Sequence, residues 1–351
     1  MPKGDKAHNR VALPDKQQVL FNPGPVNLHA EIKASLFNME LCHRQPEFEE
    51  LYERVAGRLF DVAALSPATH RLSLLHGSGS TAVDAGLTSL VRGRVLVVNN
   101  GFYCDRVAAT LSLADSSTVF QHAPGIGAPP DLEELDRQLN RERPDWLAVV
   151  HHETTTGLLN PLDDLARATE QYGCRLFVDA VSSFGAHSIP SSCDVVCFNS
   201  NKCLESLPGV AGVFWSADLR PQPIVPVLDV GAYADAIPTT PNVHAFIALD
   251  VALDLLAAED RPARYKRLAR KVWETGGARF ELFLPEEQRS HVLASFRLGD
   301  NDGDELLHRA LNGGFVIYAG QKQLRGEIFR VANMGAAIDE HVIESLFEAL
   351  A

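Results

Sequence analysis

Hydrophobic and polar positions alternate in blocks between about residues 70 and 215. Short apolar runs are separated by stretches with helical spacing, such as Asp131–Arg141 and Leu162–Tyr172. Such short and continuously apolar runs are typical of strands that are buried on both faces. The alternation therefore predicts an α/β fold with a mostly parallel central sheet covered by helices. The expected strands are Leu72–Leu75, Val95–Asn99, Trp146–His151, Arg175–Asp179, Asp194–Asn199 and Gly212–Trp215.

The pattern changes after about residue 220. Pro221–Pro241 is rich in proline and predicts an irregular excursion over the surface. A helix over Val243–Ala258 is expected next, followed by a mixed α+β segment with strands near Ser295–Leu298 and Phe315–Ile317. We therefore expect a large domain over residues 26–242, and a smaller α+β domain formed by residues 1–25 and 243–351.

Composition narrows the possible partners and location. The net charge of −13 argues against binding to nucleic acids or to anionic membrane surfaces. No apolar stretch is long enough to cross a bilayer, and the polar first ten residues do not resemble a secretory signal, so we expect a cytoplasmic location. The six cysteines form no CxxC pair and the histidines have no metal-binding spacing. Reduced thiols and no metal site are therefore expected.

Two polar motifs follow the first two expected strands of this block, at strand ends where ligands of α/β sheets gather. Ser78-Gly79-Ser80 lies between a strand and a helix, where glycine and free N–H groups favour an anion. An ordinary helix cap is the alternative, and the absence of Walker or GxGxxG spacing disfavours a nucleotide. Tyr103 follows the next strand, where an aromatic ring either covers a planar ligand or packs a domain interface.

A carboxylate and an amine follow two later strands. Asp179 closes a strongly apolar strand, and burial of its charge is unfavourable unless a cation lies nearby. Lys202 follows the next buried strand, 23 residues further on, about one strand–helix–strand step. Two adjacent strand ends would then bring both groups to one pocket, which is what a cofactor held on a lysine requires. An N-cap or a structural ion pair is the alternative for Asp179.

With these motifs in place, the chain resembles the class V aminotransferases, a family of fold-type-I pyridoxal-phosphate (PLP) enzymes. The resemblance runs almost end to end. The Glu-Thr-Thr-Thr-Gly and Asn-Lys-Cys forms favour the phosphonate branch of the family over the alanine–glyoxylate branch. The motifs that carry it are Asn22-Pro23-Gly24-Pro25, Gly77–Ser80, His152–Gly157, Asp179–Gly185, Asn201-Lys202-Cys203, Gly314–Tyr318 and Phe329-Arg330-Val331.

The resemblance implies a role for each matching residue toward the cofactor. Lys202 would hold PLP covalently and move the substrate proton, and Asp179 would pair with the ring nitrogen. Tyr103 and Val181 would cover the two ring faces, and Thr154 or Thr155 would contact the ring's phenolic side. The phosphate would be bound by Ser78, Gly79 and Ser80. Thr239 matches a residue that reaches the neighbouring subunit's phosphate in the family, so a homodimer with shared active sites is implied.

The resemblance also implies a reaction on small acids. Arg330 would clamp the acid group of each substrate, with Asn22, Gly24 and Arg44 as further substrate contacts. The expected reaction moves the amino group of 2-aminoethylphosphonate to pyruvate, a small-molecule donor and a keto-acid acceptor. A sibling transaminase for another small acid and a PLP-dependent lyase remain alternatives. The stretch between Lys202 and Thr239 looks short for the phosphonate branch, and Ala236 stands where a bulky aromatic is expected.

Overall fold

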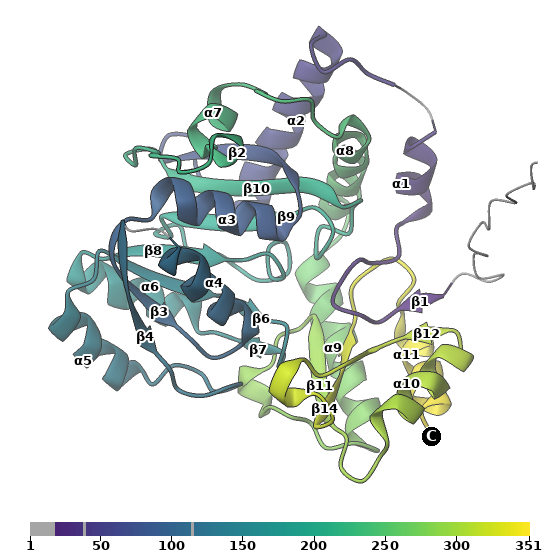
Figure 1. Ribbon diagram of the computed structural model, residues 1–351. Coiled ribbons are helices and arrows are strands. Elements are labelled where there is room, and N and C mark those ends of the chain that lie inside the picture. Colours follow the sequence, from purple (N-terminus) through teal and green to yellow (C-terminus); the bar gives the residue numbers. More distant parts are fainter. Residues whose placement is uncertain (1–17, 38–39, 114–115) are drawn as a thin grey trace, which may run out of the picture.

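The apolar runs become the strands of a seven-stranded central sheet (Figure 1). The computed structural model describes residues 18–37, 40–113 and 116–351. Only β10 runs antiparallel to its neighbours, β2 and β9, and the other pairs are parallel. The mostly parallel sheet is thus confirmed. In spatial order the strands are β2 (His70–Gly77), β10 (Gly209–Ser216), β9 (Val195–Asn199), β8 (Arg175–Asp179), β5 (Trp146–Val150), β3 (Gly93–Val98) and β4 (Ser117–His122).

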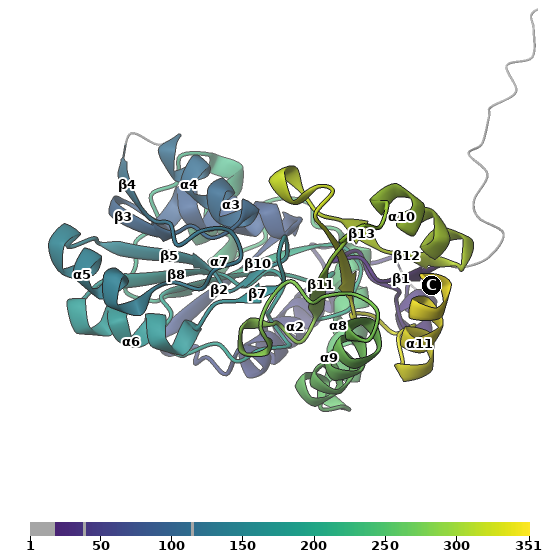
Figure 2. The same cartoon turned by 90° about the horizontal axis from the view of Figure 1, so that it is seen from below.

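Helices cover both faces of this sheet, as Figure 2 shows for α3 and α4 on one side and α2 and α6 on the other. Each face has its own buried apolar cluster. One contains side chains of α3 (Gly79–Leu90), α4 (Phe102–Ser112) and α7 (Val230–Asp235). The other contains side chains of α2 (Pro46–Ala63), α5 (Leu132–Glu142), α6 (Leu162–Tyr172) and α8 (Val243–Ala257).

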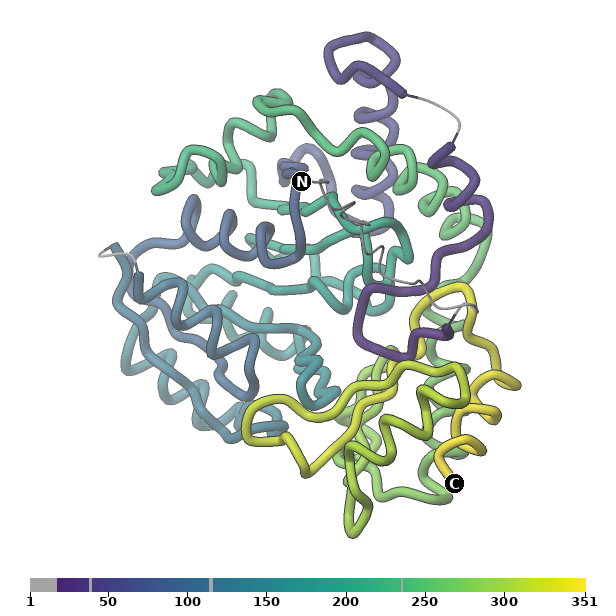
Figure 3. The backbone as a smooth tube through the Cα atoms, turned by 45° about the vertical axis from the view of Figure 1, so that its right-hand side comes forward, coloured from purple at the N-terminus to yellow at the C-terminus, as the bar shows by residue number. Residues whose placement is uncertain are grey.

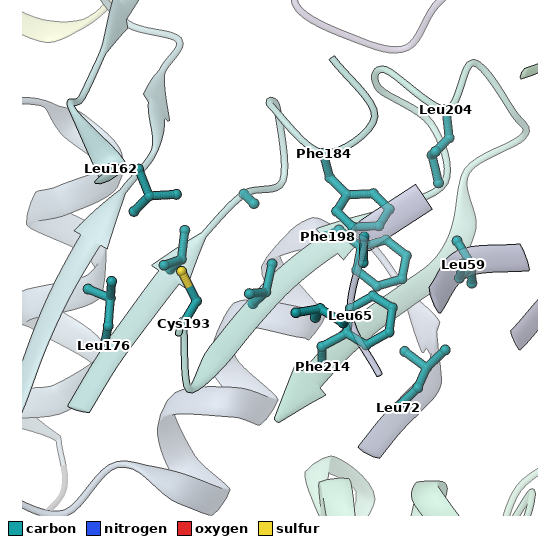
Figure 4. Close-up of a cluster of buried hydrophobic side chains, with 14 of the residues drawn as sticks. Leu59, Leu65, Leu72, Leu162, Leu176, Phe184, Cys193, Phe198, Leu204 and Phe214 are labelled. Carbon is teal, nitrogen blue, oxygen red and sulfur yellow. The ribbon is translucent and has the colours of Figure 1, made fainter. Parts of the chain in front are cut away.

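The second of these clusters includes a row of three phenylalanines (Figure 4). The rings of Phe184 and Phe198 stack with centroids 4.2 Å apart, and those of Phe198 and Phe214 lie 5.4 Å apart. Phe198 and Phe214 belong to β9 and β10, and Phe184 follows β8. This packing fixes the ends of the strands that carry Asp179 and Lys202, because closely packed rings leave little room for backbone shifts.

The expectation for the proline-rich residues 221–241 needs correction. The proline-rich stretch is not only a surface excursion: it contains η1 (Pro226–Leu228) and α7, whose Val230 and Tyr233 are buried against the sheet. The apolar spacing of this short helix is hidden among prolines in the sequence. Phe246 and Leu249 of α8 belong to the core of the large sheet, because α8 packs on α2. We therefore propose that the large domain extends through α8, beyond the expected boundary at residue 242.

A second layer of structure forms from the C-terminal third of the chain. Its three-stranded sheet has the order β11 (Leu293–Arg297), β14 (Ile328–Ala332) and β13 (Tyr318–Ala319). The helices α9 (Arg261–Gly277), α10 (Gly303–Asn312) and α11 (Glu340–Ala349) accompany it. The remaining elements are short: α1 (Ala30–Ser35), β6 (His152–Glu153), β7 (Leu158–Leu159), η2 (Glu286–Gln288) and η3 (Lys322–Leu324).

The N-terminal end of the described chain joins this C-terminal part. Strand β1 (Val19–Leu20) pairs in parallel with β12 (Phe315–Val316), and the purple segment accordingly reaches the C-terminal layer in Figure 3. The expected strand near Phe315–Ile317 therefore pairs with β1 and not within the three-stranded sheet. Residues 1–17 of the expected small domain lie outside the described residues. Within the described part, no helix combines the length and apolar character needed to span a membrane.

Candidate active site

A cavity of about 200 Å³ lies at the carboxyl ends of the central strands. Eight residues predicted from the sequence line it: Ser78, Gly79, Ser80, Tyr103, Thr154, Asp179, Val181 and Lys202. Eight others also line it: Val83, Arg106, Val150, His152, Ser182, Asn199, Asn201 and Pro208. The four polar signals of the sequence thus meet in one place, as expected from the geometry of parallel strands.

The anion cradle is built at the start of α3. Ser78 caps the helix, its backbone N–H donates to Thr81 Oγ1 at 3.1 Å, and the next N–H groups are free of helix partners. Gly79 is required because a Cβ atom there would lie 2.4 Å from Val181 Cγ1. The backbone can therefore reach the cavity wall beside Val181, which no larger residue at position 79 allows.

Asp179 and Lys202 come from neighbouring strands. β8 ends at Asp179, which is in register with Cys197 of β9, and Lys202 follows the end of β9. Burial raises the pKa of Asp179 to about 6, although the backbone N–H of Val181 donates to its Oδ1 at 3.0 Å. Burial lowers the pKa of Lys202 to about 8. Asp179 forms no ion pair with another described residue, although Arg106 and Lys202 oppose the effect of burial on its pKa.

A buried glutamate holds the residues that are predicted to contact the cofactor ring. Glu153 is fully buried, and its Oε2 accepts from the Tyr103 N–H at 2.9 Å. Its Oε1 accepts from the Thr155 hydroxyl at 2.5 Å, so Thr155 is turned toward Glu153 while Thr154 lines the cavity. The structure thus favours Thr154 over Thr155 as the cofactor contact, a choice that the sequence left open.

Arg330 lies in the middle of β14, buried to 2% exposure. Its guanidinium donates to the carbonyl oxygens of Thr154 at 3.0 Å and Ala319 at 2.8 and 3.1 Å. It forms no ion pair with another described residue, and burial lowers its pKa. A buried cation whose partners are all neutral carbonyls is suited to an anionic ligand. Arg330 does not itself line the 200 Å³ cavity but contacts Thr154, which does.

The segment Asn22–Gly24 lies against the lysine. Lys202 Nζ donates to the carbonyl of Pro23, and a Cβ atom on Gly24 would lie 2.8 Å from that Nζ. Gly24 also has a φ of +125°, a conformation that favours glycine. Asn22 is buried, and its Oδ1 has no hydrogen-bond partner among the described residues. This segment is therefore close to the chemistry although it lies outside the cavity lining.

Two predicted residues lie away from the cavity. Arg44 and Thr239 are both exposed, and neither lines the cavity. The Thr239 hydroxyl hydrogen-bonds with that of Tyr233 at 3.1 Å. Their predicted roles, one toward the substrate and one toward the phosphate of a second subunit, stay predictions.

The sequence reasoning missed two residues that matter electrostatically. Arg106 donates to Ser80 Oγ and pairs with Asp84 at 2.7 Å, which places a cation beside the anion cradle. Its position one helical turn after Tyr103 on α4 was the available signal. The Nδ1 of His152 lies 3.1 Å from the carbonyl of Ser182, its Nε2 has no described partner, and burial lowers its pKa to about 4. His152 is therefore a neutral imidazole at physiological pH.

The described residues contain no group of three or more metal-ligand side chains, and all six cysteines are free thiols. Five of these cysteines are buried, and burial raises the pKa of the Cys203 thiol beside Lys202 to about 12. That thiol stays protonated near neutral pH and is a poor nucleophile.

Known proteins are similar to this chain in both sequence and fold. Residues 91–275 match the family model described as aminotransferase class V. A 2-aminoethylphosphonate–pyruvate transaminase of Burkholderia thailandensis is 33% identical over 351 residues, covering 92% of this chain and 93% of that protein. This chain belongs to the class V aminotransferases. A protein of the same name from Pseudomonas aeruginosa is 30% identical, covering 97% of this chain and 98% of that protein.

Solved structures of other aminotransferases have the same fold as this class V aminotransferase. The alanine–glyoxylate aminotransferase of Nostoc sp. superposes with a TM-score of 0.89 at 24% identity, over 100% of this chain and 99% of that chain. The pyridoxamine–pyruvate aminotransferase of Mesorhizobium loti gives 0.88 at 24% identity, over 96% and 92% of the two chains. The fold-type-I architecture expected from the sequence is thereby confirmed.

Proposed function

We propose that this aminotransferase binds PLP and moves the amino group of 2-aminoethylphosphonate to pyruvate, giving phosphonoacetaldehyde and L-alanine. The observation that carries the proposal is the pair of Asp179, which is buried and forms no ion pair with a described residue, and Lys202, which is half-buried, at the ends of adjacent strands. The names of the two bacterial relatives support the choice of donor and acceptor.

The described residues fit each part of PLP. The cradle Ser78–Ser80 suits the phosphate, and Tyr103 and Val181 line the cavity where a planar ring would lie. Asp179 supplies the anion that a protonated ring nitrogen needs. When bound, PLP supplies the aldehyde carbon that carries the amino group and a ring that takes up electrons.

Lys202 is suited to both holding the cofactor and moving a proton. Its lowered pKa of about 8 leaves a useful fraction of neutral amine near neutral pH, and only the neutral amine is a nucleophile or a base. Its Nζ can then take a proton from the substrate carbon that bears the nitrogen. It can deliver a proton to the cofactor carbon that receives the amino group. Asp179 stays ionised while it holds the ring nitrogen's proton, since a cation beside it lowers its pKa.

Arg330 is our candidate for orienting the acid group of both substrates. Its charge is buried without a carboxylate, and its planar guanidinium suits a carboxylate or phosphonate. A phosphonate carries more charge than a carboxylate, so a second cation would help. We propose that Arg44 and Thr239 act across a homodimer interface, because both are exposed and outside their own cavity.

The test is a half-reaction. The purified protein with PLP is mixed with 2-aminoethylphosphonate and no keto acid, while the visible absorbance of the lysine-bound cofactor is followed. We expect the band to disappear and to return when pyruvate is added. Arg330→Gln should weaken this response strongly, whereas the matched variant Arg325→Gln, at an exposed arginine of the same region, should respond like the wild type.

The other outcomes separate the alternatives. A band that persists with 2-aminoethylphosphonate but is lost with L-alanine keeps the aminotransferase and rejects the phosphonate donor. Free ammonia released without any keto acid indicates a lyase. If no visible band forms with PLP, the cofactor assignment is wrong.

A further inference from the structure

Glu205, three residues after Lys202, combines two unfavourable features. It is 5% exposed although it carries a charge, and its φ of +57° lies in the left-handed region that non-glycine residues avoid. Burial of a carboxylate and a left-handed backbone each destabilise a fold unless the surroundings compensate. Contacts with surrounding residues must therefore hold Glu205 in this position.

The Glu205 carboxylate is fully paired. Its Oε1 accepts from Arg264 at 2.7 Å, from the Tyr265 hydroxyl at 2.6 Å and from the Gly335 N–H at 2.7 Å. Its Oε2 lies 3.3 Å from Arg261 Nη1. Three of these partners come from α9, and Gly335 follows β14, so the whole set belongs to the C-terminal layer.

The same groups fix the backbone beside the lysine. The carbonyl of Cys203 accepts from Arg261 Nη1 at 3.0 Å. The Tyr265 hydroxyl, whose single proton is donated to Glu205, has its oxygen 3.2 Å from the same carbonyl. The N–H of Glu205 donates to the carbonyl of Lys202 at 2.9 Å. The peptide groups on the C-terminal side of Lys202 are therefore tied to α9, and with them the starting point of the lysine side chain.

A second cavity lies beside part of this segment. Leu204 and Glu205 line a space of about 650 Å³ on a different side from the smaller cavity that Lys202 lines. Residues 202–205 thus contribute to the lining of both cavities. The side chains of Cys203 and Leu204 are packed in buried apolar clusters, and the polar contacts of Glu205 add a directional restraint to that packing.

The cluster is also balanced in charge. Glu259 pairs with Arg264 at 2.9 Å and with Arg261, giving two carboxylates and two guanidinium groups. Burial alone would raise the pKa of Glu205, but Arg261 and Arg264 lower it overall, so the carboxylate stays ionised. Removing the Glu205 charge would leave the two arginines with one carboxylate between them.

We propose that Glu205, with Arg261 and Tyr265, is a positioning group for Lys202. This inference rests on the proposed function, and Glu205 is not a catalytic residue, because it lies outside the lining of the smaller cavity. The cluster holds the lysine segment against the layer that carries Arg330, since Gly335 follows β14 within five residues of that arginine. It thereby sets where Nζ stands relative to the substrate's acid group.

The experiment compares Glu205→Gln with Asp250→Asn in the PLP-loaded protein. Asp250 is the matched control, because it also accepts from two arginines, Arg54 and Arg58, but joins α8 to α2 away from the lysine. Three quantities are measured: the melting temperature, the pH titration of the visible band, and kcat and KM of the half-reaction. Both variants should lower the melting temperature.

Only Glu205→Gln should change the chemistry. We expect kcat to fall by about 10- to 100-fold, with KM within about 2-fold of the wild type. Displacement of the base slows proton transfer but leaves the contacts that bind the substrate in place. The pH titration of the visible band should shift, and Glu205→Asp, which keeps the charge, should recover part of both effects. If Glu205→Gln does not fold, Arg261→Lys is used in its place, since it weakens the hold on the Cys203 carbonyl while keeping the charge.

The positioning role would be overturned if Glu205→Gln, measured well below its melting temperature, had a kcat within about 2-fold of the wild type and an unshifted pH titration of the visible band. A change in KM alone would overturn it as well. A wild-type protein without a visible band, or without response to any amino donor, indicates failure of the proposed function itself, which is a different result.

Discussion

Two carboxylates in the neighbourhood of Lys202, Asp179 and Glu205, are about equally buried but have opposite surroundings. Asp179, on the cavity side, is 6% exposed and forms no ion pair, as the neighbouring His152 Nε2 and Asn199 Oδ1 lack hydrogen-bond partners among the described residues. Glu205, on the other side, is 5% exposed and has every oxygen satisfied. The difference teaches that unmet groups indicate where a ligand completes the structure, and satisfied ones indicate where the chain holds its own shape.

The pKa values of the two carboxylates reflect the same contrast. Burial raises the pKa of Asp179 to about 6, whereas two arginines lower that of Glu205 against the effect of its burial. One carboxylate therefore destabilises the protein without its cofactor, and the other stabilises it. Four predictions test this contrast.

The largest effect is expected for Lys202→Ala. Loss of the amine removes both the covalent hold on PLP and the base, so turnover should fall by at least about 10³-fold and the visible band should be absent. Single-turnover absorbance measurements check this. A variant that keeps the band would place the cofactor on another lysine.

Glu205→Ala should have the largest effect on stability. It leaves Arg261 and Arg264 buried with too little negative charge, which lowers the free energy of unfolding by about 3–5 kcal/mol. Since the pKa of Glu205 is lowered by folding, its contribution is present above its unfolded pKa and is lost as the pH falls through the folded value. Urea unfolding at neutral and at acid pH should therefore show a smaller difference from the wild type in acid.

Asp179→Asn should act in the opposite direction on the protein without PLP. The raised pKa means that the ionised carboxylate destabilises the fold fully above about pH 6, and that this effect disappears below about pH 4. Stability at pH 8 should rise by up to about 3 kcal/mol, with little change at pH 4, while PLP binding weakens. Equal destabilisation at both pH values would remove the contrast with Glu205.

The smallest effect concerns the pH dependence of cofactor capture. Because the pKa of Lys202 is lowered to about 8, the rate at which PLP attaches should rise about tenfold per pH unit below 8 and level off above it. Stopped-flow absorbance of the reconstitution measures this rate. A rise that continues to pH 10 would mean that the amine is solvated like a free lysine.

Much of this site was predictable from the sequence, because the spacing of apolar positions and the order of the strands determine where its residues lie. Asp179 ends one apolar run and Lys202 follows the next, and parallel strands bring their carboxyl ends to one edge. The fold class followed from the same alternation. The cofactor roles assigned to these residues rested on the family resemblance and stay proposals.

The parts that were missed depend on contacts between distant segments. Nothing local in Leu-Glu-Ser shows that Glu205 meets Arg261 and Tyr265 of α9, more than 50 positions later. Arg330 was predicted to bind the substrate's acid group from the family resemblance alone, and only tertiary packing buries it beside Thr154. The proposed extension of the large domain past residue 242 also depends on a distant contact, since the partner of α8 is the helix α2.

The pairing of β1 with β12 has a consequence for when the enzyme becomes competent. Val19 contacts a strand that begins at Phe315, and the N–H of Ala332 donates to the carbonyl of Phe21 at 2.7 Å. The segment that lies against Lys202 is therefore secured by residues such as Phe315 and Ala332, which are synthesised well after Lys202. Such long-range closure forms late in folding. A nascent chain that already contains Lys202 should consequently capture PLP poorly until Ala332 has left the ribosome.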